Sequence, residues 1–158
     1  MISPKEEQTL VLLKPDALQR NLLGEIIHRF EAKGLKIVGM KMIHLSDAQL
    51  DEHYAHIKDK PFFPGNKAFM SSYPVVAMVL AGIRAVNVVR TMLGPTKGHE
   101  ALPGTIRGDF SMSTQANIAH ASDSLEAAKG EVKRFFAPNE LYVYKKLDFD
   151  LSYSDDEK

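Results

Sequence analysis

Cysteine is absent from the 158-residue chain, and so is a net charge. Without cysteine the chain has no disulfide framework, no thiolate nucleophile and no cysteine-based zinc site. Any covalent chemistry must therefore use histidine, serine, lysine or a carboxylate. The 20 basic side chains are balanced by 20 acidic ones, and this balance argues against a dedicated nucleic-acid binder.

Long apolar runs are absent too. The longest, Val75 to Ala81, has seven residues, whereas spanning a bilayer takes about 18 or more. Residues 1–7 (M-I-S-P-K-E-E) lack the basic segment and the apolar stretch of a secretory signal. We therefore expect a cytoplasmic protein with no membrane contact, and we interpret Val75 to Ala81 as a buried strand.

No repeat period and no linker-like composition divide the chain. Its 44% hydrophobic and 25% charged residues are average for a globular domain of this length. We expect one domain over residues 1–147. The acidic segment 148–158 is expected to form a surface tail with little order.

Strands and helices alternate along the chain. Apolar runs or alternation predict strands at 9–14, 35–45, 74–81 and 117–120. Apolar spacings of three and four predict helices at 22–30, from about 47 onward, and at 67–72, 84–93 and 125–136. Ser46 and Gln49 form a capping box before the second of these helices. Alternation alone suggests a parallel sheet but does not exclude other pairings.

Two stretches interrupt this regular pattern. Pro61 and Pro64 bracket Phe62 and Phe63, which predicts that both aromatic side chains lie on a turn. Residues 96–110 show no sustained period yet hold three glycines and one proline. Such a long stretch within a compact domain is usually functional or disordered.

The six histidines have unequal surroundings. The neighbours of His28, His44 and His99 are those of ordinary solvated side chains. His53 and His56 stand three residues apart on one predicted helix and could approach a metal together, but no cysteine or nearby carboxylate completes a zinc-like ligand set. We therefore expect no metal site built from protein side chains.

His120 is a stronger candidate because it follows a predicted strand and precedes a run of small and polar residues. Such a strand-to-helix junction places side chains in a cleft. A neutral imidazole, with an ordinary pKa of about 6.5, is a good nucleophile toward phosphorus at pH 7. The alternative is a hydrogen-bonded core histidine, and the local pattern leaves both open.

Three cationic side chains could bind a phosphate group. The segment 104–108 (G-T-I-R-G) joins flexible backbone to the Arg107 guanidinium, which can grip phosphate oxygens in a bidentate way. Arg90 and Lys14 could converge on the same anion, although each alone is typical of a surface charge. The chain contains neither G-x-x-x-x-G-K-[ST] nor G-x-G-x-x-G, so no P-loop or dinucleotide site is supported.

Six ordered segments resemble the nucleoside-diphosphate kinase family. They are T-L-V-L-L-K-P-D-A (9–17), E-H-Y (52–54), K-P-F-F (60–63), V-V-R-T-M-L-G-P-T (88–96), P-G-T-I-R-G-D-F (103–110) and N-I-A-H-A-S-D-S (117–124). The likeness runs from about Thr9 to Tyr144. It implies a ferredoxin-like α/β fold, in which a four-stranded antiparallel sheet carries helices on one face.

The resemblance also implies a reaction. The γ-phosphate of a nucleoside triphosphate such as ATP would move to His120 and then to a nucleoside diphosphate, in a ping-pong mechanism. His120 would carry it as a pros-phosphohistidine, Glu131 would bond the other ring nitrogen, and Ser122 would support that contact and the leaving oxygen. Mg²⁺ is implied as cofactor, held by the nucleotide phosphates because the chain shows no dedicated carboxylate cluster.

The remaining matched residues are implied to bind the nucleotide. Arg90 and Arg107 would hold the phosphates, and Phe62 would stack on the base. Hydroxyl donors and contacts to the sugar and the γ-phosphate would come from Tyr54, Thr96, Lys14 and Asn117. Stacking has little base preference, so broad nucleotide specificity would follow.

Three residues depart from the family pattern. Ala121 stands where a glycine is usual, Thr114 where a valine usually lines the base site, and Ala116 where a basic residue is common. They motivate an alternative function, a nucleotide-binding scaffold of the same fold with reduced turnover. A nucleic-acid-binding protein is a further alternative that rests only on basic residues in loops.

The resemblance implies a homo-oligomer, either a tetramer or a hexamer. We favour the hexamer because the segment past Phe136 is long enough to pack on a neighbouring subunit.

Overall fold

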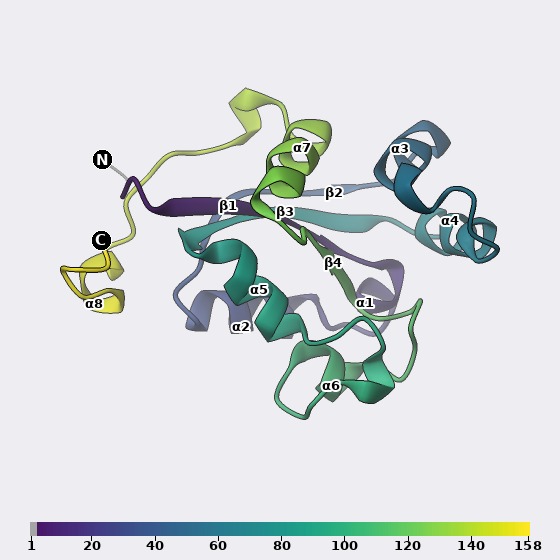
Figure 1. Cartoon of the computed structure of the whole chain (residues 1–158), viewed down its shortest axis with the longest axis horizontal. Helices are drawn as coiled ribbons and strands as arrows, with labels where there is room; N and C mark the ends of the chain where they lie inside the picture. Colours follow the sequence, from purple (N-terminus) through teal and green to yellow (C-terminus); the bar gives the residue numbers. More distant parts are fainter. Residues whose placement is uncertain (1–2) are drawn as a thin grey trace.

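The computed structural model describes residues 3–158 and contains one antiparallel sheet of four strands in the order β2-β3-β1-β4 (Figure 1). β1 (Glu6–Leu13) pairs with β3 (Val75–Ile83) and with β4 (Ala119–Ala121), and β2 (Lys36–Ile43) pairs with β3. The antiparallel sheet implied by the resemblance is confirmed. The parallel arrangement suggested by alternation is wrong, because pairing joins segments far apart in sequence that no local pattern relates.

Helices cover both faces of this sheet, so the expectation of helices on one face is wrong (Figure 1). The reason lies in β1, where Leu10 and Leu12 face one buried cluster while Val11 and Leu13 face another. A strand that is apolar on both sides must be covered on both. One face is covered by α3 (Asp47–His53), α4 (Phe63–Ser71) and α7 (Leu125–Phe135). The other is covered by α1 (Pro15–Gln19), α2 (Leu23–Ala32), α5 (Ala85–Leu93) and α6 (Ile106–Phe110).

The predicted start of α3 is confirmed. The Ser46 hydroxyl accepts a hydrogen bond from the backbone N–H of Gln49 at 3.3 Å, and the Gln49 side chain accepts one from the Ser46 N–H at 3.0 Å. A short 3₁₀ turn, η1 (Ala55–Ile57), follows the end of α3.

α4 begins four residues earlier than predicted, at Phe63. Pro64 lies in its first turn, where a missing N–H costs no helical hydrogen bond. As a result Phe63 is buried in the core, whereas Phe62 is 57% exposed. The prediction that both aromatics lie on a turn therefore holds for Phe62 alone.

The stretch 96–110 contains more regular structure than its pattern indicates. It holds a 3₁₀ turn, η2 (Gly98–Glu100), and α6, whose N-terminus is capped by the Thr105 hydroxyl through the N–H of Gly108 at 3.0 Å. Five-residue helices such as α6 are too short to show a period in the sequence.

The acidic segment 148–158 contains a short helix, α8 (Phe149–Ser152), which differs from the expected tail of little order. The Tyr153 hydroxyl accepts a hydrogen bond from the N–H of Ile83 at 3.2 Å, and Lys5 Nζ donates to the carbonyl of Asp156 at 2.9 Å. These contacts hold the segment beside the start of β1 (Figure 1). No helix within residues 3–158 is both long enough and apolar enough to cross a membrane.

Candidate active site

A turn with strained backbone precedes β4 and fixes where the strand begins. Ile118 has a φ of +75°, a left-handed conformation that β-branched residues rarely adopt. Its N–H donates to the Asp16 carboxylate at 3.0 Å, and its carbonyl accepts from the N–H of Lys14 at 2.8 Å. Such strain persists where the surroundings hold it, and here the Lys14-Pro15-Asp16 turn after β1 holds the segment that leads into His120.

The position of His120 in the sheet fixes the face on which its side chain lies. It pairs with Leu12 of β1, which belongs to the core cluster beneath α3 and α7. Its Nε2 atom lies 3.0 Å and 3.2 Å from the two carboxylate oxygens of Glu131 on α7. Nδ1 makes no hydrogen bond to any residue within 3–158, so it is the ring nitrogen available to a ligand.

Glu131 is held by two partners. Besides His120, the Ser122 hydroxyl donates to Glu131 Oε2 at 2.7 Å while accepting from the N–H of Leu10 at 3.2 Å. Burial alone would raise the pKa of Glu131, but the hydrogen bonds from His120 and Ser122 outweigh it and lower the pKa to about 2. The carboxylate is therefore charged, and it accepts a hydrogen bond from the N–H at Nε2 of His120.

A cleft of about 560 Å³ opens beside His120. Glu131 and Ser122 lie behind the imidazole and do not line it. Eight of the ten residues predicted for the site do line it: Lys14, Tyr54, Phe62, Arg90, Thr96, Arg107, Asn117 and His120. The structure thus brings together side chains from segments more than 100 residues apart.

Lys14 and Asn117 form a buried hydrogen-bonded chain at the cleft. Lys14 Nζ donates to Asn117 Oδ1 at 2.6 Å and to the carbonyl of Gln115 at 3.1 Å, and Asn117 Nδ2 donates to the carbonyl of Thr96 at 2.8 Å. Burial, aided by the charge of Arg107, lowers the pKa of Lys14 to about 8. Lys14 is therefore a cation at neutral pH that loses its charge on modest alkalinisation.

Arg107 has less freedom to grip a ligand than its loop sequence predicts. Its guanidinium donates to the backbone carbonyls of Gly94, Asn117 and Ala119 at 2.9, 3.1 and 2.6 Å. Since arginine has five N–H donors, two remain for a ligand. Burial, with the nearby charge of Arg90, lowers the pKa of Arg107 to about 10. The residue both ties α6 to the end of α5 and to the segment that enters β4, and supplies positive charge.

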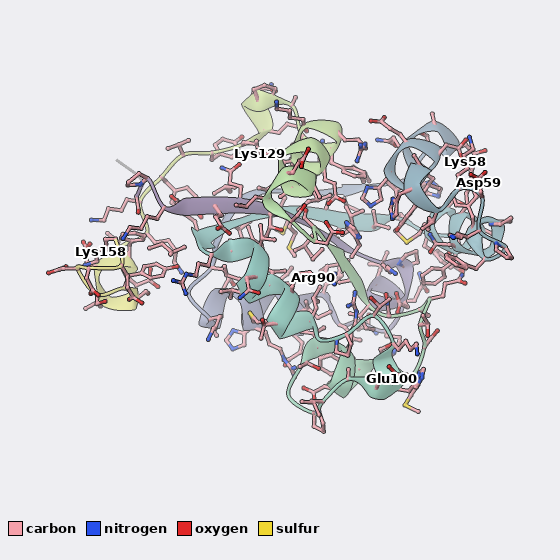
Figure 2. The ribbon with its side chains drawn as sticks, viewed as in Figure 1. Lys58, Asp59, Arg90, Glu100, Lys129 and Lys158 are labelled. Carbon is pink, nitrogen blue, oxygen red and sulfur yellow. The ribbon has the colours of Figure 1, made fainter. Side chains whose placement is uncertain are left out.

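Arg90 and Tyr54 also contribute to the polar lining. Arg90 lines the cleft from α5, and Figure 2 shows it near the middle of the molecule, whereas Lys58 and Asp59 lie toward one end and Lys158 toward the other. The Tyr54 hydroxyl is buried and has no hydrogen-bond partner among the described residues, and burial raises the pKa of Tyr54 to about 12. It therefore keeps its proton and can donate to an anion.

The two histidines predicted to share one helix do not pair. α3 ends at His53, so His56 falls on η1 and is no longer one turn further along the same helix. His53 is buried against His120, with ring centroids 4.5 Å apart, while His56 is exposed and lines the cleft. The sequence does not reveal the role of His53 beside the imidazole, although the E-H-Y segment contains it.

Several further cleft residues were not predicted from the sequence. They are His56, Ile57, Asn66, Gln115 and Asp123. Thr114, which departs from the family pattern, also lines the cleft. Ala121 lies in β4 and is not among the non-glycine residues with positive φ, which within residues 3–158 are Asn21, Arg84 and Ile118. An alanine therefore fits at position 121 without strain.

The site contains one group with metal-ligand chemistry among the described residues. Ligand atoms of His53, His120 and Glu131 lie within 4.8 Å of one another. Mg²⁺ takes oxygen ligands in an octahedral arrangement, so two imidazoles and one hydrogen-bonded carboxylate do not fit it. The cleft itself is lined by cations and hydroxyls, with Asp123 as a carboxylate among them.

Comparisons with known proteins point to one family. A family model described as "Nucleoside diphosphate kinase" matches residues 7–141. The chain is 54% identical over 151 residues to a nucleoside diphosphate kinase of Parabacteroides distasonis, covering 96% of this chain and 99% of that protein. It is 48% identical over 147 residues to nucleoside diphosphate kinase B of Homo sapiens, covering 93% and 97%.

Solved structures show the same likeness. A halophilic nucleoside diphosphate kinase from Halobacterium salinarum in complex with CDP matches with a TM-score of 0.92 and 41% identity, over 94% of this chain and 99% of that one. A nucleoside diphosphate kinase family protein from Babesia bovis matches with a TM-score of 0.89 and 40% identity, over 93% and 99%.

Proposed function

Because the chain belongs to the nucleoside diphosphate kinase family, and so is an enzyme that transfers a phosphoryl group between nucleotides, we propose that His120 carries that group. The observation that supports this most directly is the environment of its ring. Glu131 binds Nε2 from behind, and Nδ1, at the cleft, has no hydrogen-bond partner in the part of the chain that the structure describes. This arrangement selects the tautomer with the proton on Nε2 and the lone pair on Nδ1.

The transfer proceeds in two balanced steps. The Nδ1 lone pair attacks the γ-phosphorus of a nucleoside triphosphate, the P–N bond forms, and the bond to the bridging oxygen breaks so that the diphosphate leaves with its electrons. The Nε2–H remains bonded to Glu131, whose charge stabilises the positive charge that the ring gains. A second diphosphate then attacks the phosphohistidine, and the reverse bond changes restore His120.

The cations of the cleft stabilise the charge that spreads over the phosphate oxygens during transfer. In this proposal Arg90 and the two remaining N–H groups of Arg107 hold the phosphates. Lys14 and Asn117 bind the sugar hydroxyls and the γ-phosphate region. Hydroxyl donors come from Tyr54, whose buried O–H has no partner within residues 3–158, and from Thr96.

Phe62 is proposed to stack on the base. Its ring is 57% exposed at the cleft, unlike its buried neighbour Phe63. The similar protein from Halobacterium salinarum was solved in complex with CDP, which supports nucleotide binding by this chain too. Base stacking is tolerant of base identity, so ATP, GTP and pyrimidine nucleotides are all expected substrates, with Thr114 as a polar neighbour.

Nucleotide kinases generally need a divalent metal, and we propose Mg²⁺. It would arrive bound to the nucleotide phosphates and would neutralise part of their negative charge. Asp123, a carboxylate that lines the cleft, could help to hold a metal that the nucleotide brings.

A cytoplasmic location and a homo-oligomer are proposed from the sequence. On the edge strand β2, Met40 and Met42 are 53% and 57% exposed, and exposed apolar side chains of this kind favour association. We favour the hexamer. A solution mass of six chains supports this choice, and a mass of four chains refutes it.

The test is transfer from ATP to GDP by the wild type, His120→Ala and His28→Ala, where His28 is an exposed histidine on α2. We expect GTP formation by the wild type and His28→Ala and none by His120→Ala. A scaffold with reduced turnover would bind both nucleotides and exchange nothing. Full transfer by His120→Ala would show that another residue carries the phosphoryl group.

A further inference from the structure

His53 is a buried imidazole whose ring nitrogens make no hydrogen bond to the described residues. It is the last residue of α3, and it is 4% exposed. Its ring packs edge-on against Tyr54, His120 and Phe135, with centroids 4.6, 4.5 and 5.2 Å apart. A buried polar group without a partner costs free energy, so it calls for an explanation.

The nearest polar atom to one of these nitrogens belongs to Glu131. His53 Nδ1 lies 4.0 Å from Glu131 Oε1, just beyond hydrogen-bond distance. The other oxygen, Oε2, already accepts from Ser122 at 2.7 Å and from His120 at 3.0 Å. Among residues 3–158, Oε1 accepts only through the longer 3.2 Å contact to His120, so it has spare acceptor capacity on the side that faces His53.

His53 stays neutral in this position. Burial lowers its pKa most, the charges of His120, Arg134 and His56 lower it further, and Glu131 opposes them, leaving a pKa of about 3. A neutral ring has one N–H donor. It can therefore support the Glu131 carboxylate without neutralising its charge, and without repelling the positive charge that His120 gains on phosphorylation.

We propose that His53 is a positioning residue for phosphoryl transfer, which packs against the His120 ring and presents its Nδ1–H to Oε1 of Glu131. This inference rests on the proposed function of His120. A movement of the carboxylate by about 1 Å closes the gap to normal hydrogen-bond length. His53 then keeps both carboxylate oxygens in place while His120 gains and loses the phosphoryl group.

The first test uses the unmodified protein and no nucleotide. ¹⁵N NMR of the imidazole nitrogens at pH 7 reports which nitrogen of each histidine carries the proton. We expect His53 as the Nδ1–H tautomer and His120 as the Nε2–H tautomer. A His53 with its proton on Nε2, or with both nitrogens protonated, overturns the proposal whether or not the protein transfers phosphate.

The second test compares two variants of His53. In His53→Asn the amide nitrogen takes the place of Nδ1 and keeps a donor, whereas His53→Phe keeps an aromatic ring and loses the donor. We expect His120 phosphorylation by ATP to slow about tenfold or more in His53→Phe, as for the loss of a hydrogen bond to a charged group. We expect an unchanged KM, and a rate within about threefold of wild type in His53→Asn.

The contrast between the variants separates positioning from packing. Equal losses in both variants, or no loss in His53→Phe, overturn the inference. His28→Phe, on an exposed face of α2, is the matched control for a histidine-to-phenylalanine change. If the wild type itself forms no phosphohistidine, the proposed function fails, while the tautomer of His53 is still decided by NMR. That measurement also stands if His53→Phe does not fold.

Discussion

Replacing Glu131 by glutamine removes one negative charge from behind the catalytic imidazole and changes little else. The amide oxygen can still accept from Nε2 of His120, and the side chain keeps its length. What is lost is the charge that two hydrogen bonds maintain, from His120 at 3.0 Å and from Ser122 at 2.7 Å. The expected result is slower phosphorylation of His120 with little change in nucleotide binding, because Glu131 does not line the cleft.

The size of the effect follows from two contributions. A hydrogen bond to a charged partner is worth about 1.5–3 kcal/mol and a neutral one about 1 kcal/mol, so the substitution costs about 1–2 kcal/mol here. The attraction between a carboxylate and the developing imidazolium charge adds to this. At about 4 Å and an effective dielectric constant of about 20 it is at most about 4 kcal/mol, and solvent at the partly exposed His120 ring reduces it. We expect about 2–3 kcal/mol in total, or roughly 30- to 150-fold in rate.

The assay is single-turnover phosphorylation by ATP, followed by rapid quenching. Glu126→Gln is the matched control because Glu126 lies exposed in the first turn of the same helix. Phosphorylation at the wild-type rate in Glu131→Gln would refute the assignment of Glu131 as the group that stabilises the charged ring. A loss carried entirely by KM would refute it as well.

Other consequences follow from the same structure. Phe62→Ala should raise KM for purine and pyrimidine triphosphates by similar factors, roughly 5- to 150-fold for about 1–3 kcal/mol of stacking, and a change confined to one base would contradict broad specificity. The free energy of unfolding should fall by about 2 kcal/mol between pH 7.5 and pH 5, because unfolded His53 binds a proton below a pKa of about 6.5 and the native ring only below about 3. Denaturant titrations should show this loss in the wild type but not in His53→Asn, and equal losses would contradict it. The value of kcat/KM should decline above pH 8, because Lys14 loses its charge. A kcat/KM that stays constant up to pH 10 would show that this charge is not needed. A chelator should abolish transfer and added Mg²⁺ should restore it, whereas unchanged turnover in the chelator would refute the metal requirement.

The secondary structure could largely be predicted from local pattern, because its causes are local. The apolar runs of β1 and β3 and the capping box at Ser46 all lead to the structures they predict. Misassignments occur where a tertiary contact decides. Phe63 is buried and Phe62 is exposed, a difference set by where α4 packs and by the tolerance of a first helical turn for Pro64.

The sequence predicts the candidate site as a set of residues, and the structure shows how they interact. The sequence predicts that the guanidinium N–H groups of Arg107 bind phosphate, yet three of them donate to backbone carbonyls. His53 and His120 are 67 positions apart, and only the packing of α3 against β4 makes them neighbours. No periodicity in the sequence relates two such positions, so neither the edge-on contact nor the orphaned nitrogens of His53 could have been found from it.

The most direct test of this account is the chemical identity of the phosphorylated atom. The protein, incubated with ATP and Mg²⁺ and separated from nucleotide, should carry an acid-labile and alkali-stable phosphoryl group. Peptide mapping with ³¹P–¹H NMR should place it on Nδ1 of His120, and adding GDP should discharge it as GTP. A phosphoryl group on Nε2 of His120 or on Ser122, or one that GDP does not remove, would contradict the account.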